Sequence, residues 1–314
     1  MHIRRDATHI EIDTPAKVNL LLEVLSKRSD GYHEIETVLV AVTLYDTLIF
    51  IPRSDQELEL ASRWTGGIVA QDGATRSSAA VGDERLAVEI PVGPENLVWR
   101  AAALLRERSG CQRGATIKLV KRIPSAAGLG GASSDAAAAL VAANTGWQLG
   151  WTRTRLAELA AELGSDVPFF LTLGAALCRG RGERIAPLVP PRLHVVIVRP
   201  PIGLSTPRVY KECVPAAEPQ GAAALVAALA GGDPARVARH LRNDLTAPAV
   251  KLTPWIKRLE VEFKRQGVLG HQMSGSGSSY FGLCSTARHA LRIAARLRAR
   301  GLGAVFQTTA AVAS

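Results

Sequence analysis

The chain has 314 residues, more than one compact core usually holds, so we expect two packed domains or one large unit of mixed helices and strands. Hydrophobic residues make up 47% and charged residues 21%, a balance typical of folded globular proteins and not of disordered chains. The formal net charge of +10 suits an anionic ligand, but arginines spread along helix-like stretches and an aromatic content of 5% argue against nucleic-acid binding.

The beginning of the chain alternates apolar and polar residues, which is the pattern of half-buried β-strands. We predict strands over residues 10–13 and 18–24, then a turn over residues 26–31. Another antiparallel strand pair is predicted to contain the apolar runs 38–42 and 48–51. This part of the chain should therefore form an antiparallel sheet.

Two pairs of polar side chains are candidates for ligand binding on these strands. Lys17 and Asn19 are two residues apart, so on a strand their side chains face the same side. Tyr32 and His33 directly follow a glycine turn, where side chains can reach a ligand. The alternatives are the polar outer face of a sheet for the first pair, and for the second an aromatic at the edge of the core with an incidental surface histidine.

Residues 54–93 combine glycines and serines with short apolar pieces, and we predict an extended hairpin or a partly mobile surface insertion there. A helix is predicted to open at residues 94–98 and to run through Arg108. Apolar residues recur at helical spacing in it, and Gly110 ends it. A strand over residues 115–120 should follow.

A glycine-rich stretch with the sequence IPSAAGLGGASSDA occupies residues 123–136. Its glycines let backbone amides turn inward, and the start of the alanine-rich helix predicted over residues 136–143 adds unpaired N–H donors and a positive dipole end. The stretch is therefore a candidate phosphate-binding loop. It is not a Walker motif, because no lysine follows the last glycine, and it lacks the context of a dinucleotide fingerprint. A tight turn before a helix is the alternative.

Asp166 follows a helix predicted over residues 152–163, with Thr152 as its cap and Gly164 as its stop. Glycine and serine precede this aspartate and apolar residues follow it, so its carboxylate should be ionised yet poorly solvated. Such a group suits a proton acceptor. The alternative is a helix N-cap ahead of Pro168, and the two roles are compatible.

The pattern of residues along the sequence changes from about residue 177, and a second domain is predicted to begin there. A buried strand over residues 193–198 precedes a proline-rich turn and two or three helices, including one over residues 254–266. A glycine-serine loop, a strand, a helix and a final strand are then expected over residues 273–279, 280–284, 287–300 and 304–308. Without a regular βαβ rhythm, this order predicts the α+β class.

The four cysteines lie far apart and show no C-x-x-C spacing, so neither a zinc site nor a disulfide framework is predicted, and we expect buried thiols. The first residues lack an apolar signal core, and no apolar run is long enough to cross a bilayer. We therefore expect a cytoplasmic protein that does not bind membranes.

Three stretches together resemble the GHMP kinase superfamily: residues 15–20 (PAKVNL), residues 124–136 and residues 274–279 (SGSGSS). Their order and spacing match as well, and the similarity covers nearly the whole chain. The resemblance implies a two-domain α+β fold. Residues 1–182 would form a ribosomal-S5-domain-2-like domain that binds ATP, and residues 183–314 a ferredoxin-like domain, with the substrate in the cleft between them.

The resemblance also implies roles for residues that match the superfamily's motifs. Lys17 and Asp166 match its catalytic pair, with ATP and Mg²⁺ as cofactors and no metal ligand assigned. The residues implied in substrate binding are Asn19, Tyr32, His33, Asp166 and Tyr210. Those implied in ATP binding are Pro124, Ser125, Ala126, Ala127, Gly128, Leu129, Gly130, Gly131, Ala132, Ser133 and Ser134.

The implied reaction is phosphorylation of the 2-hydroxyl group of a cytidine-diphosphate-linked methylerythritol in the non-mevalonate isoprenoid pathway, by a monomer or weak homodimer. Phosphoryl transfer needs a phosphate cradle, a proton acceptor and a cation beside the developing alkoxide. The glycine-rich stretch, Asp166 and Lys17 can supply these.

Two alternatives remain. Another small-molecule kinase of the superfamily, for homoserine, mevalonate or a sugar, shares the glycine-rich loop, but the segment around Tyr32 and His33 favours the cytidine-linked acceptor. A non-catalytic nucleotide-binding or RNA-binding S5-like protein is disfavoured by the presence of both Lys17 and Asp166.

Overall fold

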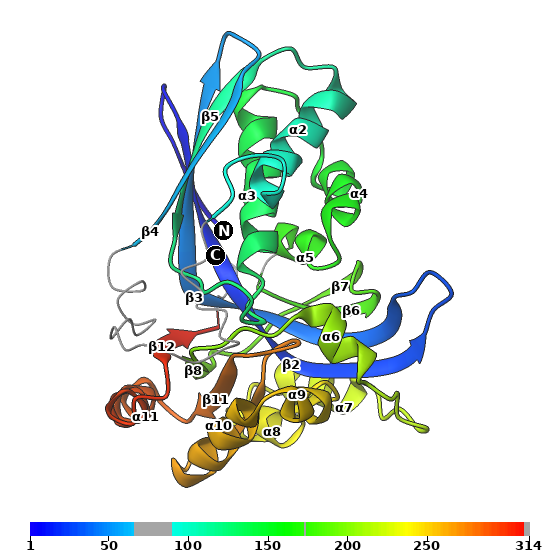
Figure 1. Ribbon diagram of the computed structural model, residues 1–314, viewed down its shortest axis with the longest axis vertical. Helices are drawn as coiled ribbons and strands as arrows, with labels where there is room; N and C mark the ends of the chain where they lie inside the picture. Colours follow the sequence, from blue (N-terminus) through cyan, green and yellow to red (C-terminus); the bar gives the residue numbers. More distant parts are fainter. Residues whose placement is uncertain (66–89, 173, 311–314) are drawn as a thin grey trace, which may run out of the picture.

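The computed structural model describes residues 1–65, 90–172 and 174–310, which form two β-sheets flanked by helices (Figure 1). The prediction for residues 54–93 falls mostly on residues 66–89, which lie outside the described residues. Among the described residues, no helix is both long and apolar enough to cross a membrane.

The first sheet contains eight strands, in which β1-β2-β3-β5-β4 are neighbours, β6 pairs with β3 and β7, and β9 pairs with β2. These strands are β1 (His2–Arg5), β2 (Ile10–Lys27), β3 (His33–Arg53), β4 (Leu58–Trp64), β5 (Gly114–Lys121), β6 (Ala175–Gly180), β7 (Arg184–Leu188) and β9 (Arg242–Asn243). The second sheet has the order β10-β11-β8-β12 and consists of β8 (His194–Arg199), β10 (Gly270–Met273), β11 (Tyr280–Cys284) and β12 (Ala304–Thr309).

A layer of helices covers one face of the first sheet, and helices pack against both faces of the second. Those packed on the first sheet are α2 (Leu97–Ser109), α3 (Gly131–Gly146), α4 (Arg153–Leu163) and α5 (Val167–Leu171). Those in the second half of the chain are α6 (Thr206–Lys211), α7 (Ala223–Ala230), α8 (Pro234–Arg239), α9 (Thr246–Leu252), α10 (Pro254–Arg265) and α11 (Ala287–Ala299). This mixture of antiparallel sheets and helices is the predicted α+β class.

The strands β2 and β3 form one long antiparallel hairpin, where the sequence suggested shorter strands. The predicted breaks were wrong because the ladder absorbs irregular residues as register shifts, the first of them between Pro15 and Ala16. The second strand of the hairpin also changes partner, pairing with β6 over residues 35–40 and with β5 over residues 47–53. The hairpin therefore runs through the whole first sheet and ends beyond α6 (Figure 1).

Local capping signals placed two helices correctly. Asn96 caps α2, its side chain accepting a hydrogen bond from the Val98 amide at 2.9 Å, and Gly110 closes the helix in the left-handed conformation. Thr152 caps α4 in the same way, accepting from the Arg155 amide at 3.3 Å. Both helices thus have the predicted ends to within a few residues.

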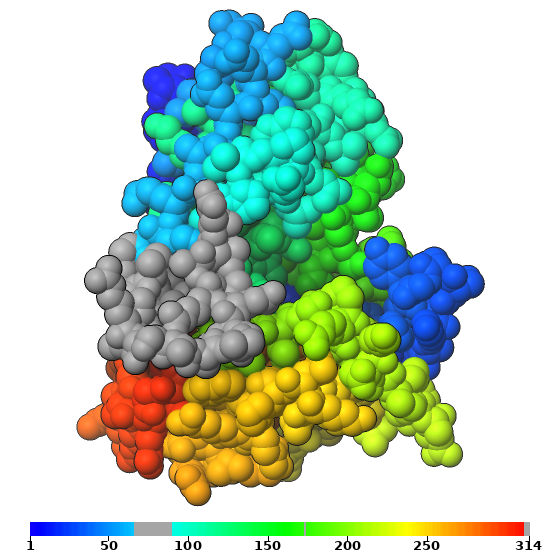
Figure 2. Space-filling model, in the orientation of Figure 1, coloured from blue at the N-terminus to red at the C-terminus, as the bar shows by residue number. Residues whose placement is uncertain are grey.

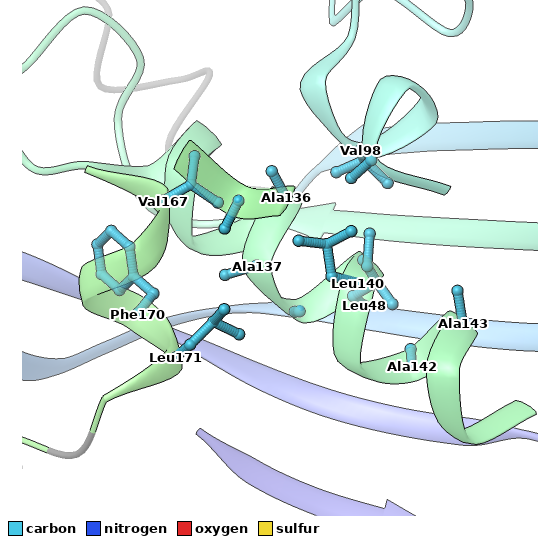
Figure 3. Close-up of a cluster of buried hydrophobic side chains, with 14 of the residues drawn as sticks. Leu48, Val98, Ala136, Ala137, Leu140, Ala142, Ala143, Val167, Phe170 and Leu171 are labelled. Atoms are coloured by element: carbon cyan, nitrogen blue, oxygen red, sulfur yellow. The ribbon is translucent and has the colours of Figure 1, made fainter. Parts of the chain in front are cut away.

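The central helix α3 begins at Gly131, five residues earlier than predicted, so Ser133 and Ser134 of the glycine-rich stretch lie in its first turn. Its alanines are almost all buried, and their small side chains let the helix pack directly on the first sheet. Figure 3 shows this core, with Ala136, Ala137 and Leu140 of α3 between Val98 of α2 and Val167 of α5. The core therefore fixes the N-terminal end of α3 relative to α5, which carries Asp166 at its start.

Candidate active site

A cavity of about 820 Å³ lies where the glycine-rich stretch, the β2–β3 hairpin and the second half of the chain meet. Its lining includes Lys17 of β2, Asp166 before α5, Tyr210 of α6 and the loop between β10 and β11. Figure 2 shows the tip of the β2–β3 hairpin projecting from the body of the molecule beside the segment around α6. This volume is in the range of small-molecule sites in enzymes.

The predicted site residues converge on this cavity. All of residues 124–133 line it, as do Lys17, Asn19, Tyr32, His33, Asp166 and Tyr210. Ser134 does not: it is buried in α3, and its hydroxyl has no hydrogen-bond partner among the described residues. The structure thus brings together residues that are far apart in sequence, and their roles stay predictions.

The glycine-rich loop is held against the loop between β10 and β11, which carries the SGSGSS motif. The Ser274 hydroxyl donates to the Gly128 carbonyl at 3.0 Å, and the Ser279 amide donates to the Ala127 carbonyl at 3.1 Å. Gly128 has a φ of 72°, and a Cβ added there would lie 2.0 Å from the Ser274 carbonyl oxygen. Only glycine permits this approach of the two loops.

Lys17 joins the glycine-rich loop to Asp166. Its amide donates to the Leu129 carbonyl at 2.9 Å, and its ammonium donates to Asn19 Oδ1 at 2.8 Å and lies 3.5 Å from Asp166 Oδ2. The lysine side chain is only 4% exposed, whereas that of Asp166 is 37% exposed. Because an ammonium has three donors, one N–H of Lys17 stays free for a ligand oxygen.

Asp166 occupies the N-cap position of α5, as the alternative interpretation foresaw, but its side chain makes no capping hydrogen bond. Its carboxylate is instead directed to Lys17 and borders the cavity. The carboxylate is half-exposed, lies next to a buried cation and makes no hydrogen bond to the end of the helix. It is therefore available to accept a proton from a ligand hydroxyl.

Beneath the glycine-rich loop lies a buried ionic cluster of Lys121, Asp46 and Asp135. The Lys121 ammonium contacts Asp46 and lies 2.6 Å from Asp135 Oδ2, and Asp135 also accepts the Thr14 hydroxyl at 2.7 Å. The other oxygen of Asp46 accepts the amides of Arg122 and, at 2.8 Å, Ile123. The cluster therefore fixes the chain on both sides of the loop.

Two carboxyls share one ammonium in this cluster, so one of them carries excess negative charge in a dry site. Burial, followed by the neighbouring Asp135, raises the pKa of Asp46 to about 7. The two carboxyls in turn raise the pKa of Lys121 against the opposing effect of its burial. Lys121 thus stays a cation, and Asp46 is the group that titrates.

Three aromatic side chains surround the end of the cavity near the hairpin tip. The rings of His33 and Tyr210 are 5.1 Å apart, and Tyr32 is 52% exposed. Burial, together with Lys27, lowers the pKa of His33, so its imidazole is neutral near pH 7. Burial has the opposite effect on the Tyr210 hydroxyl and raises its pKa. The neutral imidazole can hydrogen-bond to a heterocyclic base, and the exposed Tyr32 ring can stack on it.

Sequence reasoning missed two residues that hold the site in place. Thr37 accepts the Asn19 amide group at 3.0 Å and so sets which way the Asn19 oxygen points, toward Lys17. Asn243 donates to the carbonyls of Met273 and Gly275, both at 2.8 Å, and anchors the loop between β10 and β11. Neither has a local sequence signal, because each acts across the sheet on a distant segment.

Comparison with known proteins identifies the same family in both halves of the chain. The family model described as GHMP kinases N terminal domain matches residues 96–174, and that described as GHMP kinases C terminal matches residues 224–302. The 4-diphosphocytidyl-2-C-methyl-D-erythritol kinase of Pelotomaculum thermopropionicum is 45% identical over 287 residues, covering 90% of this chain and 92% of the relative. The enzyme of the same name from Symbiobacterium thermophilum is 41% identical and covers 92% and 95%.

Solved structures give the same result. A crystal structure of 4-(cytidine 5'-diphospho)-2C-methyl-D-erythritol kinase aligns with a TM-score of 0.75 at 37% identity, covering 95% of this chain and 98% of that one. A homoserine kinase from Cytophaga hutchinsonii aligns with a TM-score of 0.73 at 20% identity, covering 100% and 98%, and it shares the fold.

Proposed function

The chain belongs to the GHMP kinase family, and we propose that this small-molecule kinase transfers the terminal phosphoryl group of ATP to the 2-hydroxyl of 4-(cytidine 5'-diphospho)-2-C-methyl-D-erythritol. The observation that carries the proposal is the contact of Lys17 with Asp166 at 3.5 Å, directly beside the glycine-rich loop in one cavity. The kinases named for this acceptor are also the relatives described above, at 41–45% identity over nearly the whole chain.

The ATP phosphates are assigned to residues 124–133, without the buried Ser134. The loop is held open by its contacts with Lys17 and Ser274, and the amides at the start of α3 face an anion with the positive end of the helix. The buried cluster around Lys121 keeps both flanks of the loop in place.

The donor set of the cavity fits a magnesium ion held mainly by phosphate oxygens. Among the described residues no group of three or more acidic, histidine or cysteine side chains is arranged to hold a metal ion, and Mg²⁺ bound with a nucleotide commonly needs only one or two protein oxygens. Ser133 and Asp166 are the protein oxygen donors that line the cavity there. When bound, the ion supplies charge neutralisation for the transferring phosphoryl group.

Asp166 and Lys17 divide the chemistry of the acceptor hydroxyl. Asp166 accepts a hydrogen bond from that hydroxyl, orients its oxygen toward the terminal phosphate, and receives its proton. Lys17 keeps the carboxylate in place and offers its remaining N–H to the oxygen on which negative charge develops. Thr37 and Asn19 hold the ammonium in this position.

The cytidine end of the acceptor is assigned to Tyr32, His33 and Tyr210, with Asn19 between that end and the reacting hydroxyl. The exposed Tyr32 ring and the Tyr210 ring supply stacking surfaces, and neutral His33 supplies a hydrogen bond to the base. Recognition of a base is the feature that separates the proposed acceptor from homoserine, mevalonate or a sugar, none of which carries one.

The remaining parts of the proposal concern organisation and context. We place the domain boundary near residues 182 and 183, at the turn between β6 and β7, although β7 and β9 beyond it still belong to the first sheet. The protein would act in the cytoplasm on a small molecule of the non-mevalonate isoprenoid pathway, as a monomer or weak homodimer, without binding nucleic acid.

A panel of acceptors tests the proposal. ADP release from ATP is measured with the cytidine-diphosphate-linked methylerythritol and, in parallel, with homoserine, mevalonate and simple sugars. We expect rapid release with the first compound alone. Release with another alcohol, and none with the cytidine-linked compound, would overturn the assignment of the acceptor while leaving the kinase assignment intact.

A further inference from the structure

Five cationic side chains line the cavity, and among the described residues two of them form ion pairs, while Arg181 is near enough to Asp30 to lower the pKa of that carboxyl, after the larger effects of its burial and hydrogen bonds. Lys17 pairs with Asp166, and Lys121 pairs with the two buried aspartates beneath the loop. Lys27, Arg181 and Lys211 also line the cavity, and in the described part of the chain none of them forms an ion pair. A cavity wall with uncompensated positive charge favours an anionic ligand.

Arg181 lines the cavity at the nucleoside end of the proposed acceptor site, one residue before a glycine that lies near Asp166. Its guanidinium carbon is 4.8 Å from the centre of the Tyr32 ring, at the nucleoside end. The next residue, Gly182, lies so close to Asp166 that an added Cβ would be 3.8 Å from Asp166 Oδ1. The Arg181 amide donates to Glu183 Oε2 at 2.6 Å, which fixes the turn between β6 and β7. The Arg181 side chain thus contacts Tyr32, and the residue that follows it lies next to Asp166.

The guanidinium of Arg181 is placed but not used by the protein. Stacking on Tyr32 engages the face of the guanidinium and leaves its five N–H donors available. Within the described residues, its side chain makes no hydrogen bond, and the one hydrogen bond in which Arg181 is a donor comes from its backbone amide. A planar fork of free donors is suited to bidentate binding of phosphate oxygens.

We propose that Arg181 is a specificity-determining residue that binds the diphosphate bridge of the acceptor, while Lys27 and Lys211 add positive potential around it. The inference rests on the proposed function, since the acceptor carries its base and its reacting hydroxyl on opposite sides of that diphosphate. A ligand that reaches from Tyr32 to Asp166 lies in the cavity that Arg181 lines, with Arg181 at its Tyr32 end. The residue thereby reads the diphosphate.

Binding of cytidine and of cytidine 5'-diphosphate to the full chain separates phosphate recognition from base recognition. Isothermal titration is done with excess ADP present, so that the phosphate loop is already filled. Arg181→Met should weaken binding of the diphosphate about 10- to 100-fold, the scale of a lost charge-assisted bidentate contact, and leave cytidine within about threefold. Arg181→Lys, which keeps the charge but not the fork, should recover part of the loss.

Arg184 provides a matched control, because it is an exposed arginine on the same β6–β7 hairpin. Arg184→Met should change neither affinity. In steady-state assays, Arg181→Met should raise the KM for the cytidine-linked acceptor and leave the KM for ATP unchanged. Equal weakening of cytidine and its diphosphate would overturn the inference, because Arg181 would then serve only to hold the Tyr32 ring.

The two proposals fail in distinguishable ways. If the native chain phosphorylates the cytidine-linked acceptor and Arg181→Met binds the diphosphate as tightly as the native chain does, only the inference about Arg181 is overturned. If the native chain neither phosphorylates that acceptor nor binds the cytidine diphosphate, the proposed acceptor is wrong and the role of Arg181 falls with it.

Discussion

Replacing Lys121 with methionine should destabilise the protein strongly, because it leaves two buried carboxyls without their cation. The side chains of Lys121, Asp46 and Asp135 are at most 5% exposed, so water cannot take the place of the ammonium. Methionine keeps the length and the apolar stem of the lysine and changes mainly the charge. The substitution therefore isolates the electrostatic part of the cluster.

The expected loss in the free energy of unfolding is about 3–5 kcal/mol near pH 7. Burial and Asp135 already raise the pKa of Asp46 to about 7 with the lysine present, and its removal raises that pKa further. The folded variant thus gains protons as the pH falls, and its loss in the free energy of unfolding relative to the native chain should be smaller near pH 5.5 than near pH 8.

Urea denaturation followed by tryptophan fluorescence measures this loss, with Lys118→Met as the control. Lys118 is an exposed lysine on the same strand, β5, and its replacement should change the free energy of unfolding by less than about 0.5 kcal/mol. In the Lys121→Met background, Asp135→Asn should restore part of the stability, since it removes one of the unpaired charges. A loss below about 1 kcal/mol for Lys121→Met, or a loss that does not depend on pH, would refute this reasoning.

Two further predictions concern the ligand sites. Gly128→Ala puts a Cβ 2.0 Å from the Ser274 carbonyl oxygen and should raise the KM for ATP at least about tenfold. Gly232→Ala is the control, because Gly232 also has a positive φ, 75°, but no atom lies within 4 Å of the added Cβ, and its KM for ATP should not rise. Equal KM values for the two variants would contradict the contact between the loops. Because burial and Lys27 lower the pKa of His33, kcat/KM for the cytidine-linked acceptor should stay level down to about pH 6.5 and fall only below it. Lys27→Met should move that fall to higher pH and His33→Asn should abolish it, and an unmoved profile would count against a role for neutral His33.

The parts of the molecule that follow from local rules could be predicted from the sequence. Side chains two apart on a strand share a face, which is why Lys17 and Asn19 meet at 2.8 Å. Helix ends marked by a capping residue, such as Asn96 and Thr152, lie where the pattern placed them. The family motifs predicted the other site residues that line the cavity, because the residues of these motifs come together in the folded proteins of the family.

The parts that depend on distant segments could not be predicted in this way. The strands β2 and β3 continue through their irregular residues because each has a partner that tolerates a register shift. Asp46 appeared only as a strand residue, yet it meets Lys121 from 75 positions away. Arg181 lacks a local signal for the same reason, since its side chain contacts Tyr32 in the distant turn between β2 and β3.

The most direct test of the account is the rate constant of phosphoryl transfer by Asp166→Asn in a single-turnover assay, measured together with the affinity of the variant for ATP. Asparagine keeps the shape of the side chain but neither accepts a proton nor pairs with the Lys17 ammonium. The account predicts a fall of about a hundredfold or more in the rate, with the dissociation constant of ATP little changed. A variant that transfers phosphate at the native rate would contradict it.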